Sequence, residues 1–303
     1  MAEDHQHHHR PVPISADEVW RIYLTEGGPA LQKYLPAWMR VKNGLQSGFF
    51  RIIPTDPRCM WCDAPFRGMG APLMNAIGRG QSNRNPNVCS DCENMIKHNR
   101  GGAEVDLTMV FADIRGSTSL AEKISPTEFK TIIDRFFRVV SDELIRGGAL
   151  IDKLIGDEVT AFFVPGLAGK DHARSAVKAA QLALLKTGHA GPDGPWVPVG
   201  VGIHTGEAYV GVVGHADSVM DLTVLGDVPN TAARLAAQAA AGEIVISDKV
   251  AEVAHVDTSG LESKQYTLKG KSEPFDAWVL KVSPQRSRPL ELATRPAPKT
   301  PGK

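Results

Sequence analysis

The sequence lacks both a net charge and a long apolar run. Lys and Arg number 34, as do Asp and Glu, so no overall field draws the 303-residue chain toward nucleic acid or an acidic surface. No apolar stretch approaches the roughly 18–20 residues that span a bilayer. The first residues, Met1 to His5, lack the cationic start and apolar core of a secretory signal. We therefore expect a soluble, cytoplasmic protein that does not bind a membrane.

Cysteine is also scarce, and its placement is informative. The chain has four cysteines, which form two pairs, Cys59 with Cys62 and Cys89 with Cys92. Each pair places two thiolates on one tight knuckle, and four thiolates make a closed tetrahedral shell for Zn²⁺. The loop between the pairs is longer than in common zinc ribbons, so an iron–sulfur cluster remains the alternative. A disulfide is disfavoured in a reducing cytosol.

Composition divides the chain into four parts. Residues 1–13 are rich in His, and residues 283–303 are rich in Pro, Arg and Lys, so both are predicted to be disordered tails. Residues 14–100 are predicted to form a small module of short helices, broken at Gly27-Gly28-Pro29, together with the cysteine pairs. Residues 104–282 form the main domain. The chain is long enough for one sizeable core and one smaller module.

Basic residues around the cysteine pairs raise the question of DNA binding. They are scattered and do not form one basic helix, which makes nucleic acid a disfavoured partner. The residues concerned are Arg67, Arg79, Arg84 and Lys97.

The main domain alternates between strand and helix signals. Ser125, Pro126 and Glu128 form a capping box with Pro at the first helical position, and an apolar stripe follows. Patterns predict further helices from His172 and after a capping Asp227, and strands at 106–113, 149–155, 159–164, 198–213, 221–225, 243–247 and 266–280. Segment 198–213 is expected to hold two strands that turn near residues 204–206. This order predicts an α+β fold with a ferredoxin-like βαββαβ core, an antiparallel sheet and helices on one face.

Two carboxylates lie where apolar strands run into glycine-containing turns. Asp113 ends the segment Phe111-Ala112-Asp113 before Gly116, and Asp157 follows Gly156 at the tip of a predicted hairpin. Carboxylate oxygens at the edge of a sheet suit Mg²⁺, which prefers oxygen ligands and keeps positions open for phosphate. A third segment, Leu225-Gly226-Asp227 to Asn230 and Arg234, follows later in the same domain.

Together these three segments resemble the catalytic domain of the bacterial class III adenylate and guanylate cyclases, in the order and spacing of that family. The resemblance covers roughly residues 104–281. It implies a ferredoxin-like core and an adenylate cyclase reaction. In that reaction the ribose 3′-hydroxyl of ATP attacks the α-phosphate, giving 3′,5′-cyclic AMP and pyrophosphate. Phosphoryl transfer of this kind depends mainly on positioning and charge neutralisation.

The resemblance also implies which residues bind metal and phosphate. Asp113, Asp157 and the carbonyl of Ile114 match the ligands of two Mg²⁺ or Mn²⁺ ions. The backbone N–H groups of Gly116, Ser117 and Thr118, at a helix start, would hold phosphate oxygens. Lys271 matches a lysine that binds the triphosphate.

Base and transition-state residues follow from the same resemblance. Lys153 and Thr223 occupy the two positions that select the base, whereas guanine-selective members carry Glu and Cys there, so ATP is favoured. Asn230 and Arg234 match the pair that orients the ribose and stabilises charge on the α-phosphate. Four-residue spacing places that pair on one helix face. Family members form homodimers in which these two residues and the metal-binding aspartates of one site come from different protomers.

Two alternatives remain open after this reading. The chain could be a guanylate cyclase or a relaxed purine cyclase, because Thr223 discriminates between bases less clearly than Asp. It could also be a zinc- or redox-dependent regulatory module that only senses nucleotide. The intact Asn230 and Arg234 argue against a pure sensor, which would not need them.

Overall fold

The computed structural model describes residues 14–34, 57–83, 85–98, 101–214, 220–266 and 275–282. The predicted tails, 1–13 and 283–303, lie outside these residues. The helices are α1 (Ala16–Thr25), η1 (Gly28–Tyr34), η2 (Gly68–Gly70), α3 (Ala71–Ala76), α4 (Ser90–His98), α5 (Ser117–Ala121), α6 (Pro126–Arg146), α7 (Pro165–Ala168), α8 (His172–Lys186), α9 (Asp227–Gln238) and α10 (Asp248–Val253). The strands are β1 (Gly102–Ile114), β2 (Leu150–Ile155), β3 (Glu158–Phe163), β4 (Val199–Gly214), β5 (Met220–Leu225), β6 (Glu243–Ser247), β7 (Glu262–Tyr266) and β8 (Phe275–Lys281).

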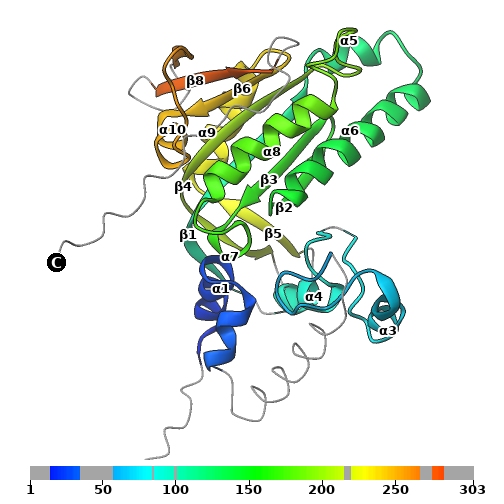
Figure 1. Ribbon diagram of the computed structural model, residues 1–303, viewed down its shortest axis with the longest axis vertical. Coiled ribbons are helices and arrows are strands. Elements are labelled where there is room, and N and C mark those ends of the chain that lie inside the picture. The colour runs from blue at the N-terminus through cyan, green and yellow to red at the C-terminus, as the bar shows by residue number, and fades with distance from the viewer. Residues whose placement is uncertain are drawn as a thin grey trace, which may run out of the picture.

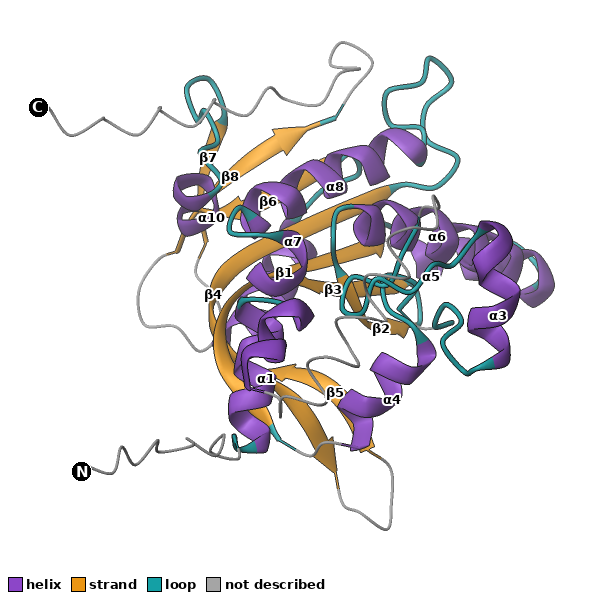
Figure 2. Ribbon diagram, turned by 60° about the horizontal axis from the view of Figure 1, so that its bottom comes forward, coloured by secondary structure: helices purple, strands orange, loops and turns teal. Residues whose placement is uncertain are grey.

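The strands form one sheet, which confirms the predicted α+β fold (Figure 1). The strand order is β2-β3-β1-β4-β6-β8-β7, and β5 pairs with β4. All pairs are antiparallel except β4 with β6. β1 and β4 pair along the whole of β1, from Gly102 opposite Gly211 to Ile114 opposite Val199, and both strands are strongly curved (Figure 2). The other strands and helices of the domain are arranged around this long ladder.

Strand β4 corrects one prediction. Segment 198–213 was expected to turn near residues 204–206, but β4 is a single strand of 16 residues. The reason is tertiary, because β1 supplies a partner for this strand on both sides of the glycine, and Gly206 lies opposite Leu107. A side chain at Gly206 would meet Val228 of α9 at 3.0 Å, so this glycine permits close packing and makes no turn.

Two other boundaries also differ from prediction. Asp227 is the first residue of α9, and Gly226 occupies the N-cap position without a side-chain cap. The predicted strand 266–280 corresponds to β8, while β7 precedes it and was missed. β7 is polar and lies at the edge of the sheet, so it lacks the apolar alternation that predicts a strand. The capping box of Ser125 with Glu128 and the β2–β3 hairpin are as predicted.

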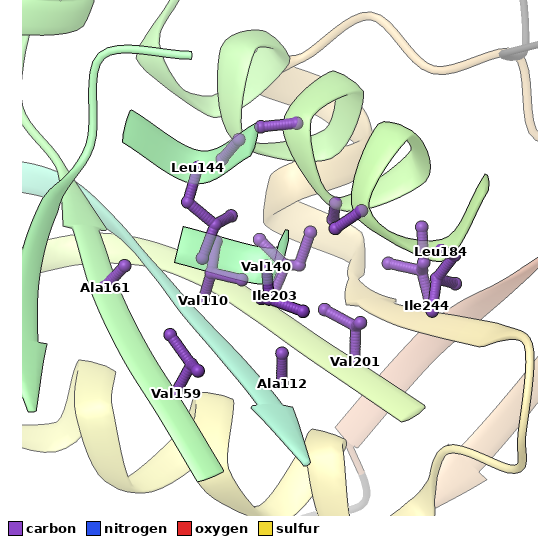
Figure 3. Packing of buried hydrophobic residues seen from close by; sticks show 14 of the residues in the cluster. Val110, Ala112, Val140, Leu144, Val159, Ala161, Leu184, Val201, Ile203 and Ile244 are labelled. Atoms are coloured by element: carbon purple, nitrogen blue, oxygen red, sulfur yellow. The ribbon is translucent and has the colours of Figure 1, made fainter. Parts of the chain in front are cut away.

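The larger core lies between the sheet and helices α6 and α8 (Figure 3). Val110 and Ala112 of β1 and Ile203 of β4 meet Val140 of α6 and Leu184 of α8 in this core. α6 contributes one apolar stripe, as its spacing predicts, and its charged residues are exposed on the opposite side except Glu143, which is buried. Within the described ranges no helix is long and apolar enough to cross a bilayer.

The second face of the sheet is also covered, which corrects the expectation of helices on one face. Leu107 and Met109 of β1 point to the opposite face from Val110. They pack with Trp20 of α1 and Trp61 of the cysteine module. α9 lies on this face as well, where its residues Val228 and Ala232 join the same cluster. The sequence did not reveal this arrangement, because a helix stripe shows that a helix is buried without showing which face of the sheet it meets.

Gly202 is the position at which α9 approaches the sheet most closely. A Cβ atom there would lie 2.1 Å from the backbone nitrogen of Ala236 and 2.4 Å from the carbonyl oxygen of Ala232. We expect Gly202→Ala to displace α9 and to lower the free energy of unfolding by about 1–3 kcal/mol, the usual cost of overpacking. Gly206→Ala is the matched control, because its nearest contact is a side-chain methyl group of Val228 at 3.0 Å and not backbone. Equal denaturation midpoints for the two variants would contradict this packing.

Candidate active site

An acidic cluster forms where β1 ends beside the β2–β3 hairpin. Asp113 lies opposite Glu158 in the β1–β3 register, and Asp157 is at the hairpin tip. The backbone N–H of Ile114 donates to the carbonyl of Asp157 at 3.2 Å, which ties the strand end to the tip. The sequence predicted that Asp113 and Asp157 would meet, and the sheet brings them together.

Burial and mutual repulsion raise carboxyl pKa values in this cluster. The pKa of Asp113 lies above its ordinary value, chiefly because burial penalises its charge and also because of the nearby Asp157. Arg115 opposes this shift through an ion pair whose nitrogen lies 2.6 Å from the Asp113 carboxylate. The pKa of Glu158 is raised by burial and then by Asp113 and Asp157. Three acidic groups thus face one guanidinium, a charge pattern that favours a bound cation.

Arg115 joins this cluster to α9. Its guanidinium donates to the carbonyl oxygens of Ala236 at 3.2 Å and Ala239 at 3.3 Å, at the end of the helix. A cation at a helix C-terminus satisfies free carbonyls and complements the helix dipole. Arg115 is part of the sequence segment that contains Asp113. Its contact with α9 could not be predicted, because sequence spacing does not show where that helix lies in the fold.

The donors at the β1 end fit a hard divalent cation. Asp113 and Asp157 offer carboxylate oxygens, and within the described residues the Asp157 carboxylate accepts no hydrogen bond or ion pair. Gly116 then turns the chain with φ of +72° and caps the short helix α5. The first N–H groups of that helix, at Ser117 and Thr118, have no partner within the helix. Carboxylate, carbonyl and N–H groups therefore gather at one strand end.

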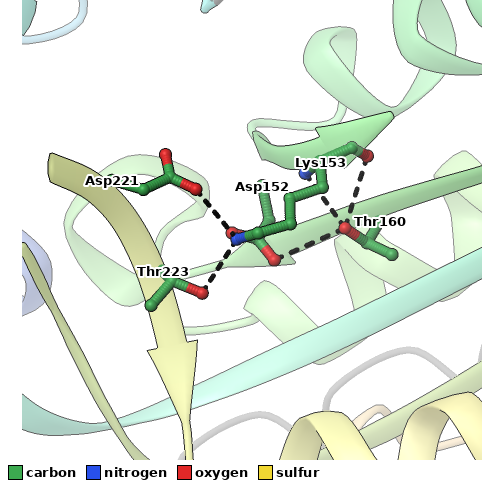
Figure 4. Close-up of polar contacts among 5 residues, drawn as sticks. All are labelled: Asp152, Lys153, Thr160, Asp221 and Thr223. Atoms are coloured by element: carbon green, nitrogen blue, oxygen red, sulfur yellow. Dashed lines mark hydrogen bonds and ion pairs between the residues drawn. The ribbon is translucent and has the colours of Figure 1, made fainter. Parts of the chain in front are cut away.

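A second polar site joins β2 to β5 (Figure 4). Nζ of Lys153 donates to Oγ1 of Thr223 at 3.0 Å, so the two residues that sequence reasoning assigned to one function lie in contact. The same Nζ is 3.0 Å from a carboxylate oxygen of Asp152 and 3.2 Å from one of Asp221. Lys153 keeps about a third of its side chain exposed, so its charge remains accessible to a ligand.

Sequence reasoning missed both carboxylates of this polar site. Asp221 lies two residues before Thr223 on β5, and the period-2 alternation of a strand could have placed the two side chains on one face. Asp152 had no comparable signal. The β2–β3 register shifts between Ile151 and Lys153, and this bulge brings Asp152 beside the lysine that follows it.

Helix α9 turns Asn230 and Arg234 away from its own sheet. Its buried residues, including Thr231 and Leu235, face the strands, whereas Asn230 is exposed and Arg234 is half-buried. Nδ2 of Asn230 donates to the carbonyl of Gly226 at 3.0 Å. Arg234 makes no hydrogen bond or ion pair with any described residue. Its guanidinium is therefore available to a ligand or a second chain. Lys271, the remaining predicted substrate residue, lies outside the described residues.

The four cysteines converge as predicted. Their sulfur atoms all lie within 4.8 Å of one another, and Sγ of Cys62 is 3.7 Å from Sγ of Cys89. Four thiolates at the usual zinc–sulfur distance of about 2.3 Å in a tetrahedron stand roughly 3.8 Å apart. The four sulfur atoms are therefore spaced like the ligands of one tetrahedrally coordinated ion.

Comparison with known proteins agrees with this geometry. An adenylate cyclase of Anabaena cylindrica is 31% identical over 189 residues, which cover 58% of this chain and 37% of that protein. The match thus spans little more than a third of this curated relative. Crystal structures of the guanylyl cyclase Cya2 (TM-score 0.53) and of the adenylyl cyclase CyaB from P. aeruginosa (TM-score 0.50) are each 28% identical. They cover 63% and 60% of this chain, and the match covers 98% and 96% of theirs.

The matched residues coincide with the curved sheet and its helices. The family model for the adenylate and guanylate cyclase catalytic domain matches residues 103–281, which exclude the cysteine module. This match covers more than half of the chain and includes both the acidic cluster and the Lys153 site. The chain therefore belongs to the adenylate and guanylate cyclase catalytic domain family.

Proposed function

We propose that the chain is an adenylate cyclase that converts ATP to 3′,5′-cyclic AMP and pyrophosphate. The observation that carries the choice of ATP is the group around Lys153, where Thr223 and Asp221 both contact Nζ. Adenine presents an amino donor where guanine presents a carbonyl acceptor. A carboxylate can only accept. Asp221 beside this pair therefore favours the adenine amino group and repels the guanine oxygen, while Lys153 donates to a ring nitrogen.

Other residues of the chain bind the metal ions and the triphosphate. Asp113, Asp157 and the Ile114 carbonyl would hold two Mg²⁺ or Mn²⁺ ions, which would supply charge that lowers the pKa of the ribose 3′-hydroxyl and neutralises the triphosphate. N–H groups at Gly116, Ser117 and Thr118 bind phosphate oxygens. Lys271 contributes a further positive charge to the triphosphate. In cyclisation the 3′-hydroxyl loses its proton to solvent water, its oxygen forms a bond to the α-phosphorus, and the bond to the pyrophosphate oxygen breaks, so that pyrophosphate leaves.

Asn230 and Arg234 act at the reacting centre. The Asn230 amide orients the ribose, and the Arg234 fork stabilises charge that develops on the α-phosphate. Their position supports a homodimer with shared sites, because both residues point away from the sheet that carries Asp113. A two-fold axis would place the outward face of α9 against the partner's acidic cluster and would build two equal sites.

The cysteine module is proposed to hold one Zn²⁺ ion. Mutual Sγ distances within 4.8 Å support a single ion over an iron–sulfur cluster, which places several atoms between its thiolates. Reduced cysteines and ATP are both features of the cytoplasm, which is the compartment we propose.

A guanylate or relaxed purine cyclase is the second candidate function. A guanylyl cyclase is among the similar solved structures, and a threonine selects less sharply than a carboxylate. Purified protein incubated with ATP or GTP and with Mg²⁺ or Mn²⁺, followed by mass analysis of cyclic product, decides between the two. Absence of cyclic product from either nucleotide would instead favour a nucleotide-sensing module.

Removal of one metal-binding carboxylate should abolish activity without loss of stability. Asp113→Asn and Asp157→Asn should each lower turnover by about 100-fold or more, as loss of an electrostatic group at a reacting centre does. Because the folded state raises the pKa of Asp113, its charge is less favourable in the folded than in the unfolded chain at pH 7. The thermal midpoint of Asp113→Asn should therefore not fall. Near wild-type turnover in either variant would refute the metal assignment.

Selectivity should depend on Asp221. Asp221→Asn should lower the ratio of kcat/KM for ATP to that for GTP by about tenfold, the value of one lost discriminating hydrogen bond. Asp152→Asn is the matched control. It contacts the same Nζ from β2, and it should change turnover of both nucleotides equally. An unchanged ratio in Asp221→Asn would remove the carboxylate from base selection.

Shared sites predict complementation between inactive variants. Asp113→Ala and Arg234→Ala homodimers should each be inactive, whereas a mixed dimer concentrates both defects in one site and leaves the other intact. Random exchange makes about half of the dimers mixed, so activity should return to roughly a quarter of the wild-type value by two-fold symmetry. Exchange can be followed with two affinity tags. Exchange without recovered activity would show that each site is built from one chain.

A further inference from the structure

The last residues of the loop between the two cysteine pairs, 85–88, are held by the knuckles themselves. The N–H of Met60, inside the first pair, donates to the carbonyl of Asn87 at 2.9 Å. The N–H of Cys89 donates to Sγ of Cys59 at 3.3 Å, and the N–H of Val88 donates to the carbonyl of Asn85 at 2.9 Å. An ion that draws the four sulfur atoms together therefore also sets the positions of Asn85 and Asn87.

These two asparagines reach across to the cyclase domain. Oδ1 of Asn85, a residue only 3% exposed, accepts from the N–H of Ile151 at 2.8 Å. Nδ2 of Asn87 donates to the carbonyl oxygens of Ile145 at 2.7 Å and Ala149 at 3.0 Å. The three bonds join the cysteine module to the end of α6 and the start of β2, and Figure 1 shows the module beside β2 and β5. Buried backbone groups need hydrogen-bond partners, and the two asparagine side chains supply them here.

The Asn85 contact falls at the bulge of an edge strand. β2 ends the sheet order, and its register with β3 shifts between Ile151 and Lys153. A bulge bends a strand and re-aims the side chains that follow it. Lys153 follows directly and reaches Thr223 on β5, which lies 70 residues further along the chain. Asn85 thus holds the backbone two residues before the lysine that contacts β5.

We propose that Asn85 and Asn87 are positioning residues for nucleotide recognition, and that the metal-loaded cysteine module aims Lys153 by clamping the bulge of β2. Loss of the metal releases both asparagines, frees the N–H of Ile151 and lets Lys153 move away from Thr223. The module thereby makes affinity for the purine base depend on a thiolate-bound divalent ion of the zinc class. This inference rests on the proposed function, because Lys153 has a base to recognise only if the chain binds a purine nucleotide.

The test uses the full chain with its bound metal and the variants Asn85→Ala and Asn87→Ala. Gln81→Ala is the matched control, because Gln81 is an exposed amide of the same loop that bonds to Pro86 and not to β2. Amide hydrogen exchange in the β2 peptide should become about tenfold faster in Asn85→Ala and in metal-stripped wild type, and should stay unchanged in Gln81→Ala. Zinc content of each protein is measured by elemental analysis.

Nucleotide binding separates a positioning role from a merely structural one. Calorimetry should show ATP affinity about tenfold weaker in Asn85→Ala that still holds its metal, with a smaller change for GTP. Stripping the metal from Asn85→Ala should add little further loss, because both changes act through the same contact. If Asn85→Ala does not fold, Asn87→Ala, whose side chain is only half-buried, gives the same comparison.

The outcomes of these measurements are distinct. A lowered melting temperature with unchanged exchange in β2 and unchanged ATP affinity would overturn the proposal and leave the module a stabilising element. Faster exchange in β2 together with weakened ATP affinity supports it, even if no cyclic product forms. Absence of ATP binding in wild type would overturn both the inference and the proposed function, whereas ATP binding without turnover would count against the cyclase assignment alone.

Discussion

The full-length pairing of β1 with β4 is the constraint on which the other parts of the domain depend. Because Gly102 to Ile114 are matched residue for residue with Gly211 to Val199, the two strands bend together and cannot slip. One end of the ladder presents Asp113 beside the β2–β3 hairpin, whose tip carries Asp157. The other end continues through β4 to β5, which carries Thr223. α9 is fixed against the ladder at Gly202, which lies opposite Phe111 and admits the helix backbone.

This constraint separates the polar groups into two sets within one chain. The acidic cluster lies at the end of β1, where burial and repulsion raise carboxyl pKa values and Arg115 supplies a local counter-charge. The second set consists of Lys153 with its partner Thr223 on β5, together with Asn230 and Arg234 on the outward face of α9. Groups that point away from their own sheet are open to a ligand or a second chain. The two-fold dimer that we propose would unite the two sets.

The cysteine module is integrated into the same architecture. Trp61 packs in one cluster with Trp20 of α1 and with Met109 of the sheet, so the module shares a hydrophobic core with the cyclase domain. Its polar contacts through Asn85 and Asn87 are equally direct. Apolar packing fixes the module against the sheet, and hydrogen bonds select the register of contact with β2. Through these contacts, as we propose, gain or loss of a metal ion at the four cysteines acts on β2, the strand that carries Lys153.

Local signals in the sequence were sufficient for the short elements and for the residue types of the site. The Ser125–Glu128 capping box and the hairpin around Asp157 are encoded by neighbouring residues, and the spacing of the cysteine pairs predicted their convergence. The single strand β4 could not be predicted, because its continuity past Gly206 is provided by β1, about a hundred residues earlier in the chain. The face that α9 covers could not be predicted either, since an apolar stripe carries no information about its partner.

The sequence by itself determined which chemical groups are present and in what order: the carboxylates, the lysine, the arginine and the thiolates. Only the tertiary structure decided which of them meet. Lys153 and Thr223 are 70 residues apart, and Asn85 and Ile151 are 66 residues apart, yet each pair is joined by a hydrogen bond. Such contacts depend on how far the β1–β4 ladder bends and on where a bulge falls in β2. Bending and register are collective properties of paired strands, so no single segment specifies them.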